Sequence, residues 1–328
     1  MGYQPTTTGP DIEDTKMITE FIVTEGEARK RLDQFLVNRE RDISRSRLQR
    51  LIELGRIRVN DRMVKPSHTI KPGDHITMDV PLPGPLLVDG KAVTLDILHE
   101  DEVLLVLNKP TGVVVHPAAG NWEGTVINAL LAHIPNQADA EMINGKRALP
   151  RLVHRLDKDT SGVMVVAKTD HAHRTLATQF EKHSINRIYE AFVWGRLRHE
   201  EGVIELPIGR DRGEPKKVSS NTAQPQRAVT EYRVEQIFGD LASQVVLFPR
   251  TGRTHQLRVH LASLGCPILG DERYGGQKVC RITGIDIPRV MLHARTLGFQ
   301  HPVSGMFQEY SIGIPLDMQG ICQALLNK

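Results

Sequence analysis

Three prolines within five residues, between Pro81 and Pro85, divide this chain into two parts of unequal length. Proline has a fixed φ and no backbone amide hydrogen, so this stretch favours neither a helix nor a hydrogen-bonded strand. We therefore expect residues 81–90 to form a stiff linker between two domains. The length of 328 residues agrees, because one domain usually contains about 100–200 residues.

The part before the linker is strongly basic. Between Arg29 and Arg58 there are ten Lys and Arg residues against four Asp and Glu, a local excess of +6, although the whole chain carries only +3. A concentrated positive charge of this kind is typical of a surface that binds phosphate groups. We predict a small basic RNA-binding module over residues 19–80, preceded by a disordered leader over residues 1–18.

Apolar residues at helical spacing predict two short helices in this module, around Leu32–Val37 and Leu48–Ile52, followed by a hairpin and a last strand near 75–80. Only one face of each helix is apolar. The arginines Arg45, Arg47 and Arg50 are therefore expected to face outward, where they either bind RNA phosphates or form an ordinary solvated surface.

The longer part of the chain contains recurring short β-type runs, with helical stretches near 125–132, 172–182 and 255–264. This mixture predicts an α+β catalytic domain over residues 91–328, built on a mostly antiparallel mixed sheet. No apolar run approaches the length of about 18 residues that a membrane-spanning helix needs. Three widely spaced cysteines without a C-x-x-C pair favour a cytoplasmic location.

The most densely charged stretch is His154-Arg155-Leu156-Asp157-Lys158-Asp159, just before the apolar run Val163–Ala167. A calcium loop fails because Lys168 stands where a glutamate is needed. A metal site is opposed by Arg155 and Lys158. An aspartyl phosphotransferase stays a disfavoured alternative, because its motif is expected directly after a strand and here the strand follows the motif. The interpretations that are favoured over it are an ionised aspartate used as nucleophile or base, and a surface turn with ion pairs.

A second polar stretch weakens the interpretation as a surface turn. Thr251-Gly252 marks a turn, and the residues from Gln256 onward predict an amphipathic helix. Three arginines, Arg250, Arg253 and Arg258, lie within nine residues of one another. Guanidinium groups at this density are well suited to contacts with phosphates or carboxylates.

Together these strings resemble the RluA/RluD family of RNA pseudouridine synthases, and look most like the ribosomal large subunit pseudouridine synthase D type, from about Thr24 to Leu316. The family's H-R-L-D signature corresponds to His154–Gly162, its tyrosine-containing strand to Arg187–Gly195, and its T-G-R-T-H-Q motif to Thr251–His260. The basic segment is similar to the small RNA-binding module of the ribosomal protein S4 type.

The resemblance implies the pseudouridine synthase fold and the isomerisation of uridine in RNA without cofactor or metal. Asp157 would be the catalytic carboxylate, acting on ribose C1′ as nucleophile or at C2′ as base. Tyr189 would stack on the uracil, and Arg253 would pair with Asp157 and keep it anionic. Arg155 would replace the flipped uridine in the stack.

The resemblance further implies that His154 orients the catalytic loop and that Arg258 contacts RNA. The expected target is large-subunit ribosomal RNA, with transfer RNA or a non-catalytic role in ribosome assembly as alternatives, and the protein is expected to be a monomer. Arg187 stands where the family often has lysine. The segments 213–226 and 281–289 match poorly and are expected to be flexible loops that face RNA.

Overall fold

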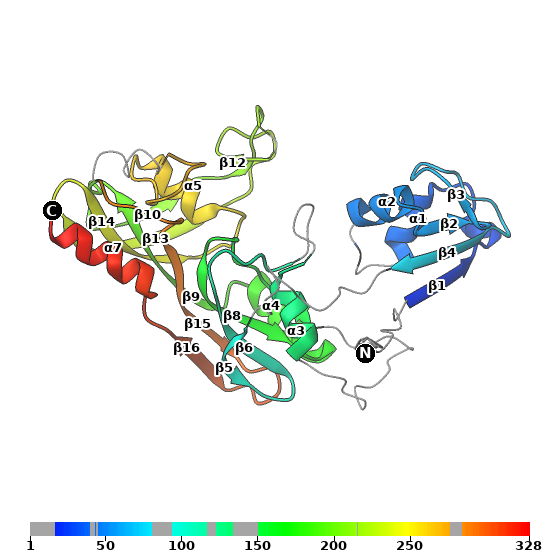
Figure 1. Ribbon diagram of the computed structural model, residues 1–328, viewed down its shortest axis with the longest axis horizontal. Coiled ribbons are helices and arrows are strands. Elements are labelled where there is room, and N and C mark those ends of the chain that lie inside the picture. The colour runs from blue at the N-terminus through cyan, green and yellow to red at the C-terminus, as the bar shows by residue number, and fades with distance from the viewer. Residues whose placement is uncertain are drawn as a thin grey trace, which may run out of the picture. The chain divides into compact units, whose positions relative to one another are not determined.

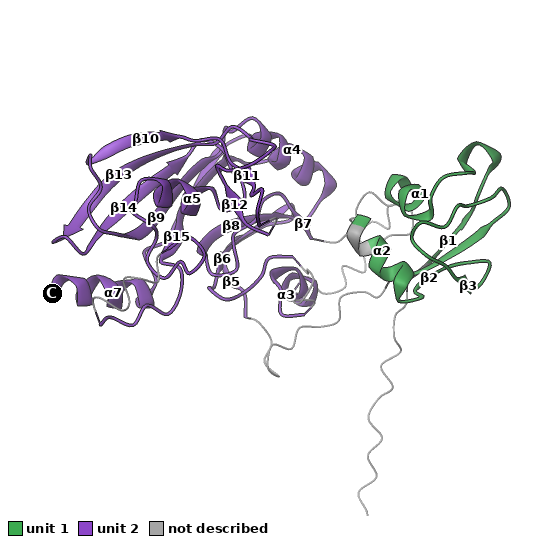
Figure 2. Ribbon diagram, turned by 90° about the horizontal axis from the view of Figure 1, so that it is seen from above, with its two compact units in different colours: residues 1–84 green, residues 85–328 purple. Residues whose placement is uncertain are grey.

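The computed structural model describes residues 17–39, 43, 45–80, 94–116, 123–133, 150–214, 216–275 and 284–328. The chain forms two compact units, residues 1–84 and residues 85–328 (Figure 2). The boundary falls within the predicted linker, residues 81–90, which lie outside the described part. The predicted leader also lies outside it as far as residue 16.

The small unit combines two helices with one antiparallel sheet, in the strand order β1-β4-β2-β3. Its elements are β1 (Met17–Ile22), the short 3-10 helix η1 (Glu25–Glu27), α1 (Leu32–Arg39), α2 (Arg45–Glu53), β2 (Ile57–Val59), β3 (Arg62–Met63) and β4 (His75–Val80). The two predicted helices, the hairpin and the last strand are present. The strand β1 was not predicted, and it begins inside the stretch that was expected to be a disordered leader.

The core of the small unit consists of the apolar positions that predicted its helices. Leu32, Leu36, Leu48 and Ile52 are completely buried and pack against strand residues such as Ile76. The sheet therefore covers the apolar face of both helices.

The large unit is built on one ten-stranded sheet with helices around it (Figure 1). Its elements in chain order are β5 (Asp96–Glu100), β6 (Leu104–Lys109), α3 (Val126–His133), β7 (Arg151–Leu152), β8 (Ser161–Ala167), α4 (Asp170–Glu181), β9 (Asn186–Trp194), β10 (Glu201–Glu205), β11 (Gly209–Arg210), β12 (Val218–Ser219), β13 (Val229–Phe238), β14 (Ala242–Pro249), α5 (Gln256–Ser263), β15 (Leu292–Gln300), β16 (Phe307–Ser311) and α7 (Leu316–Leu326).

The main sheet has the strand order β10-β13-β14-β9-β15-β8-β6-β5, with β16 added to β15 and β7 added to β8. Neighbouring strands are antiparallel except β15 and β8, which are parallel. This confirms the predicted α+β class with a mostly antiparallel sheet. No helix in the described part of the chain is long and apolar enough to cross a membrane.

The strand β8 is buried along its whole length because both of its faces are covered. Val163 and Val165 pack with Leu176 of α4 on one face, whereas Met164 and Val166 pack with Leu130 of α3 on the other. A strand buried on both sides has a continuous apolar sequence, which explains the run that follows the charged loop. The charged loop is thus attached to a strand in which every residue is buried.

The glycine at the start of β8 allows that strand to approach β15. Gly162 has φ 124°, and a Cβ atom added to it would lie 2.2 Å from the carbonyl oxygen of Ala294. The two strands pair at this point, where Gly162 is opposite Ala294. A side chain here would separate the strands directly below the charged loop.

We predict that Gly162→Ala lowers the free energy of unfolding by more than about 3 kcal/mol, because backbone atoms would have to move. The matched control is Gly195→Ala, which also has positive φ (70°) but has no atom within 4 Å of the added Cβ. It should cost only about 1–2 kcal/mol. Urea denaturation measures both, and an equal loss in the two variants would contradict the close approach described for Gly162.

Candidate active site

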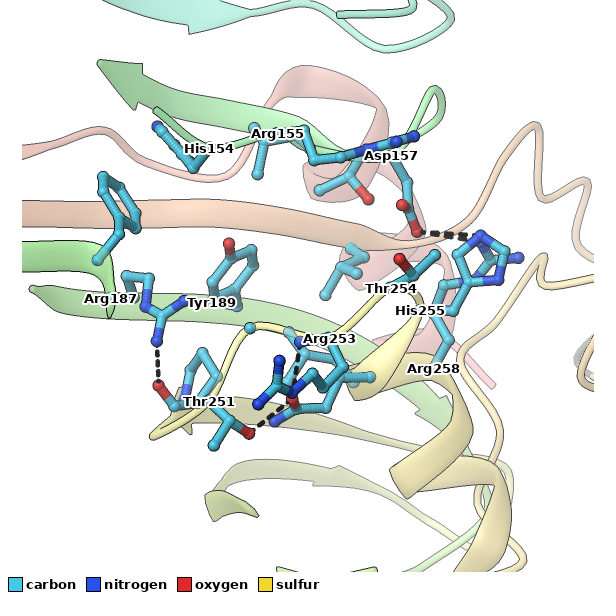
Figure 3. A pocket seen from close by; sticks show the side chains of 18 of the residues that line it. His154, Arg155, Asp157, Arg187, Tyr189, Thr251, Arg253, Thr254, His255 and Arg258 are labelled. Atoms are coloured by element: carbon cyan, nitrogen blue, oxygen red, sulfur yellow. Dashed lines mark hydrogen bonds and ion pairs between the residues drawn. The ribbon is translucent and has the colours of Figure 1, made fainter. Parts of the chain in front are cut away.

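A cavity of about 590 Å³ lies where the charged loop before β8 meets the turn before α5 (Figure 3). Both sequence motifs that predicted a site contribute to its walls. The predicted site residues of the large unit that line it are His154, Arg155, Asp157, Tyr189, Arg253 and Arg258. The fold therefore brings together residues that are up to about a hundred positions apart in the sequence.

Asp157 forms an ion pair with Arg258. The Arg258 Nη1 donates to Asp157 Oδ2 at 3.1 Å, while its Nε and Nη2 donate to the two oxygens of Asp271 at 2.6 and 3.0 Å. Asp271 is completely buried. Burial alone would lower the pKa of Arg258, but Asp271 and Asp157 outweigh it and raise that pKa. The guanidinium is thus permanently charged and held in a fixed orientation beside Asp157.

The predicted ion pair between Arg253 and Asp157 is wrong. The side chain of Arg253 is exposed, and its Nε donates to the carbonyl oxygen of Arg227 at 3.3 Å. The reason lies in His255, whose left-handed backbone (φ 55°) redirects the chain before α5 begins at Gln256. Arg258 lies in the first turn of that helix and reaches Asp157, whereas Arg253 lies before the change of direction (Figure 3).

The turn before α5 is held by the side chain of Gln256, which is buried. Its amide oxygen accepts hydrogen bonds from the Thr251 hydroxyl at 2.7 Å and from the Arg253 backbone amide at 3.0 Å. Its amide nitrogen donates to Val229 and Thr230 of β13 at 3.0 and 2.9 Å. The threonine and glutamine of this motif therefore fix the turn that presents the arginines to the cavity.

His255 forms a second contact with Asp157. Its Nε2 lies 3.8 Å from Asp157 Oδ2, and its Nδ1 lies 2.9 Å from the hydroxyl of Tyr274. The Arg258 guanidinium in turn lies over the ring of Tyr274, with its Cζ 5.1 Å from the ring centroid. Sequence reasoning did not single out His255, Tyr274 or Asp271, because their contacts with Asp157 and Arg258 are created by the fold.

Tyr189 forms a flat wall of the cavity. It lies on β9, two residues after Arg187, so that both side chains are on the same face of the strand. Burial raises the pKa of the Tyr189 phenol, and Arg187 opposes this effect only in part. The side chain therefore stays uncharged and can contact an aromatic base.

His154 joins the charged loop to the sheet. Its Nε2 accepts a hydrogen bond from the backbone amide of Val165 at 3.0 Å, and its ring stacks on Phe180 of α4 at a centroid distance of 4.6 Å. Burial, followed by the charge of Arg187, lowers the pKa of His154 to about 3. The ring is therefore neutral near pH 7, with its proton on Nδ1.

Two buried cations support the charged loop from behind. Lys109 is completely buried, and its Nζ donates to the carbonyl oxygens of Pro110, Val113 and Lys158 at 2.7, 2.8 and 3.0 Å. Burial lowers the pKa of Lys109 to about 7. The contact of Lys109 with the charged loop could not be read from the sequence.

The second of these cations is Arg289. It donates to the carbonyl oxygen of Asp159 at 3.2 Å and forms an ion pair with Asp317 at 2.6 Å. Its side chain is only 6% exposed. The expectation that segment 281–289 is a flexible loop facing RNA is therefore wrong for Arg289, whereas residues 281–283 lie outside the described part.

The remaining predicted RNA-binding residues differ in their surroundings. Arg155 is exposed at the rim of the cavity. In the small unit, Arg45 forms an ion pair with the completely buried Asp33 at 2.9 Å, and Arg50 is exposed beside Glu53 at 3.6 Å. The side chain of Arg47 lies outside the described part. Among the described residues, no group of three or more His, Cys, Asp or Glu side chains is arranged to hold a metal ion.

Comparison with known proteins identifies both units. Residues 103–263 match the family model described as RNA pseudouridylate synthase, and residues 30–76 match the S4 domain. The chain is 41% identical over 302 residues to the ribosomal large subunit pseudouridine synthase D of Zymomonas mobilis, covering 90% of this chain and 94% of the relative. It is 40% identical over 306 residues to an uncharacterized RNA pseudouridine synthase of Bacillus subtilis, covering 93% and 97%.

A solved structure shares the fold of the large unit. Human RNA pseudouridylate synthase domain containing 1 is 26% identical and has a TM-score of 0.55, covering 72% of this chain and 96% of that protein. The agreement extends to nearly the whole length of the solved chain.

The neutral His154 predicts a specific dependence of stability on pH. In the unfolded chain this histidine gains a proton near pH 6.5, whereas in the folded protein it does so only near pH 3. Between these values the unfolded state binds more protons, so the free energy of unfolding decreases as the pH falls. We predict that His154→Gln reduces this slope between pH 6.5 and 5 by up to about 1.4 kcal/mol per pH unit.

Urea denaturation at a series of pH values measures the slope. The glutamine can still accept the hydrogen bond from Val165 but cannot titrate, and His199→Gln, at an exposed histidine of the same unit, is the matched control. Identical slopes in wild type and His154→Gln would contradict the assignment of a buried neutral ring.

Proposed function

Because this chain belongs to the RNA pseudouridine synthase family, we propose that it isomerises uridines of large-subunit ribosomal RNA, with Asp157 as the group that acts on the ribose. The observation that carries this proposal is the ion pair of Asp157 with Arg258 inside a cavity that also contains Tyr189. The chain is thus an RNA pseudouridine synthase. Its target and the roles of its individual residues are what we propose.

The reaction needs an ionised carboxylate. It is an isomerisation, so the product contains the same atoms as the substrate. The bond between ribose C1′ and N1 of uracil breaks, a bond between C1′ and C5 forms, and the proton on C5 is replaced by one on N1. Asp157 acts either by attacking C1′ or by removing the C2′ proton. Arg258 stabilises the carboxylate of Asp157 by a hydrogen bond to its Oδ2. The two hydrogen bonds from Arg258 to Asp271 keep the guanidinium in this orientation.

Tyr189 supports the base while it rotates. A uracil detached from its ribose has no covalent tether, so it must be held by contacts with its faces and edges. A partly buried, uncharged phenol ring offers such a contact by stacking. Its hydroxyl is also a neutral group on that wall that could assist the removal of the proton from C5, which is the role we propose for it.

The target nucleotide has to leave its helix or loop to reach this cavity. Extrusion of a base is the general solution for enzymes that act on nucleotides within a structured nucleic acid. The exposed Arg155 at the rim of the cavity is suited to fill the vacated place in the stack. The relative named ribosomal large subunit pseudouridine synthase D favours ribosomal RNA over transfer RNA as the target, and the S4 domain favours RNA binding in general.

Asp157→Asn tests the central role directly. The amide is similar in size but is neither a nucleophile nor a base, so the single-turnover rate should fall by at least about three orders of magnitude. Release of tritium from ribosomal RNA labelled at uridine C5 measures that rate. RNA binding should persist in this variant, and full tritium release would exclude Asp157 as the catalytic carboxylate.

The variants Arg258→Met and Arg253→Met test which of the two arginines supports Asp157 in catalysis. Loss of Arg258 leaves Asp157 without its charged partner, so the single-turnover rate should fall by about 10²–10³-fold. Arg253 does not contact Asp157, and its replacement should change that rate by less than about tenfold. The same tritium assay at saturating enzyme measures both, and the opposite ranking would refute the pairing.

A further inference from the structure

Arg187 lies between the active-site cavity and a second cavity of about 460 Å³. Both cavities are lined by Arg187 together with Pro249, Thr251 and Arg253. Because Arg187 is on the same face of β9 as Tyr189, its side chain adjoins the wall on which we place the uracil (Figure 3). Any polymer that enters the active site and continues into the second cavity passes this guanidinium.

The guanidinium of Arg187 has few partners within the protein. Its Nη2 donates to the carbonyl oxygen of Pro249 at 3.1 Å, but its Nε is buried without a hydrogen-bond partner. Its Nη1 passes close to Gly252, where a Cβ atom would lie only 2.7 Å away. Within the part of the chain that the structure describes, no carboxylate forms an ion pair with Arg187.

This lack of a counter-ion distinguishes Arg187 from two other sequestered arginines of the unit. Arg258 is bound by two carboxylates, and Arg289 is bound by Asp317. Burial lowers the pKa of Arg187, as expected for a charge removed from water without compensation. A desolvated charge and an unsatisfied donor both destabilise the free protein, and an anion bound at this position would relieve both.

The surroundings of Arg187 favour an anion that belongs to the RNA. The second cavity is also lined by Arg227, Arg250 and Arg253, whereas its carboxylate, Glu231, is already bound to Arg250. An excess of guanidinium groups in a groove is the arrangement that follows a phosphodiester backbone. The absence of a side chain at Gly252 leaves room for the Arg187 fork to approach that backbone.

We propose that Arg187 binds the phosphodiester next to the target uridine, and that the RNA strand continues from there into the second cavity. This inference rests on the proposed function, since it assumes that the uridine occupies the first cavity. Arg187 is then a substrate-binding residue that fixes the ribose relative to Asp157. Lysine at the same place would supply the charge but not the planar pair of donors.

The test measures binding of a ten-residue oligouridylate to the full chain at several salt concentrations, without turnover. Arg187→Met should weaken binding about tenfold and reduce the slope of log affinity against log salt by about 0.7, the contribution of one phosphate contact with a single strand. Arg187→Lys should restore the slope. Arg233→Met, which removes an exposed arginine paired with Glu235, should leave both quantities unchanged.

A structural role would give a different result, namely a lower melting temperature with an unchanged salt slope, and that outcome would overturn the proposal. Should Arg187→Met fail to fold, the wild-type protein still provides a test. The NMR signal of the Arg187 Hε, assigned by its loss in Arg187→Lys, should move downfield when the oligouridylate is added. An unchanged signal in a protein that binds the RNA would also overturn the proposal.

These measurements do not depend on the identity of the ribosomal target. If the modification assay fails but the salt slope changes as expected, the anion site stands and the proposed target is wrong. If modification occurs but the slope is the same in Arg187→Met and wild type, the enzyme is correctly assigned and the phosphodiester site is not.

Discussion

The ion pair between Asp157 and Arg258 is the interaction on which the active site depends. Asp157 belongs to the loop before β8, Arg258 to α5, and Asp271 to the segment that follows α5. One guanidinium joins all three, and a buried charge that loses its partner is typically destabilising by about 3–5 kcal/mol. The sheet order, in which β15 lies between β8 and β9, supports the loop that carries the carboxylate.

The catalytic loop is held from two sides by different kinds of contact. In front, the side chain of Asp157 meets Arg258 and His255. Behind, Lys109 and Arg289 bind only carbonyl oxygens of the loop, at Lys158 and Asp159. Cations that bind backbone carbonyls fix the course of the loop without neutralising the carboxylate, so Asp157 stays available for chemistry while its position is constrained.

Sequence patterns predicted the features that depend on the spacing of residues close together in the chain. The apolar run at Val163–Ala167, the helix near 255–264 and the two helices of the basic module follow from spacing, and the family motifs identified the catalytic loop. The resemblance gave Arg253 instead of Arg258 as the partner of Asp157, because the correct choice depends on the left-handed His255 and on how α5 packs. Sequence patterns also missed β1. This strand pairs with β4, which lies more than fifty residues away in the sequence, and local patterns do not indicate such a pairing. Arg187 could be seen in the sequence as a departure from lysine, but its missing counter-ion is visible only in the fold.

The measurement that tests the account most directly is a map of pseudouridines in RNA from three strains: wild type, one lacking this gene, and one carrying the Asp157→Asn allele at normal protein level. We predict that the same positions in large-subunit ribosomal RNA lose pseudouridine in the deletion and in Asp157→Asn. Pseudouridine that persists in the Asp157→Asn strain but is absent from the deletion would contradict the central claim, and positions lost only from transfer RNA would overturn the proposed target.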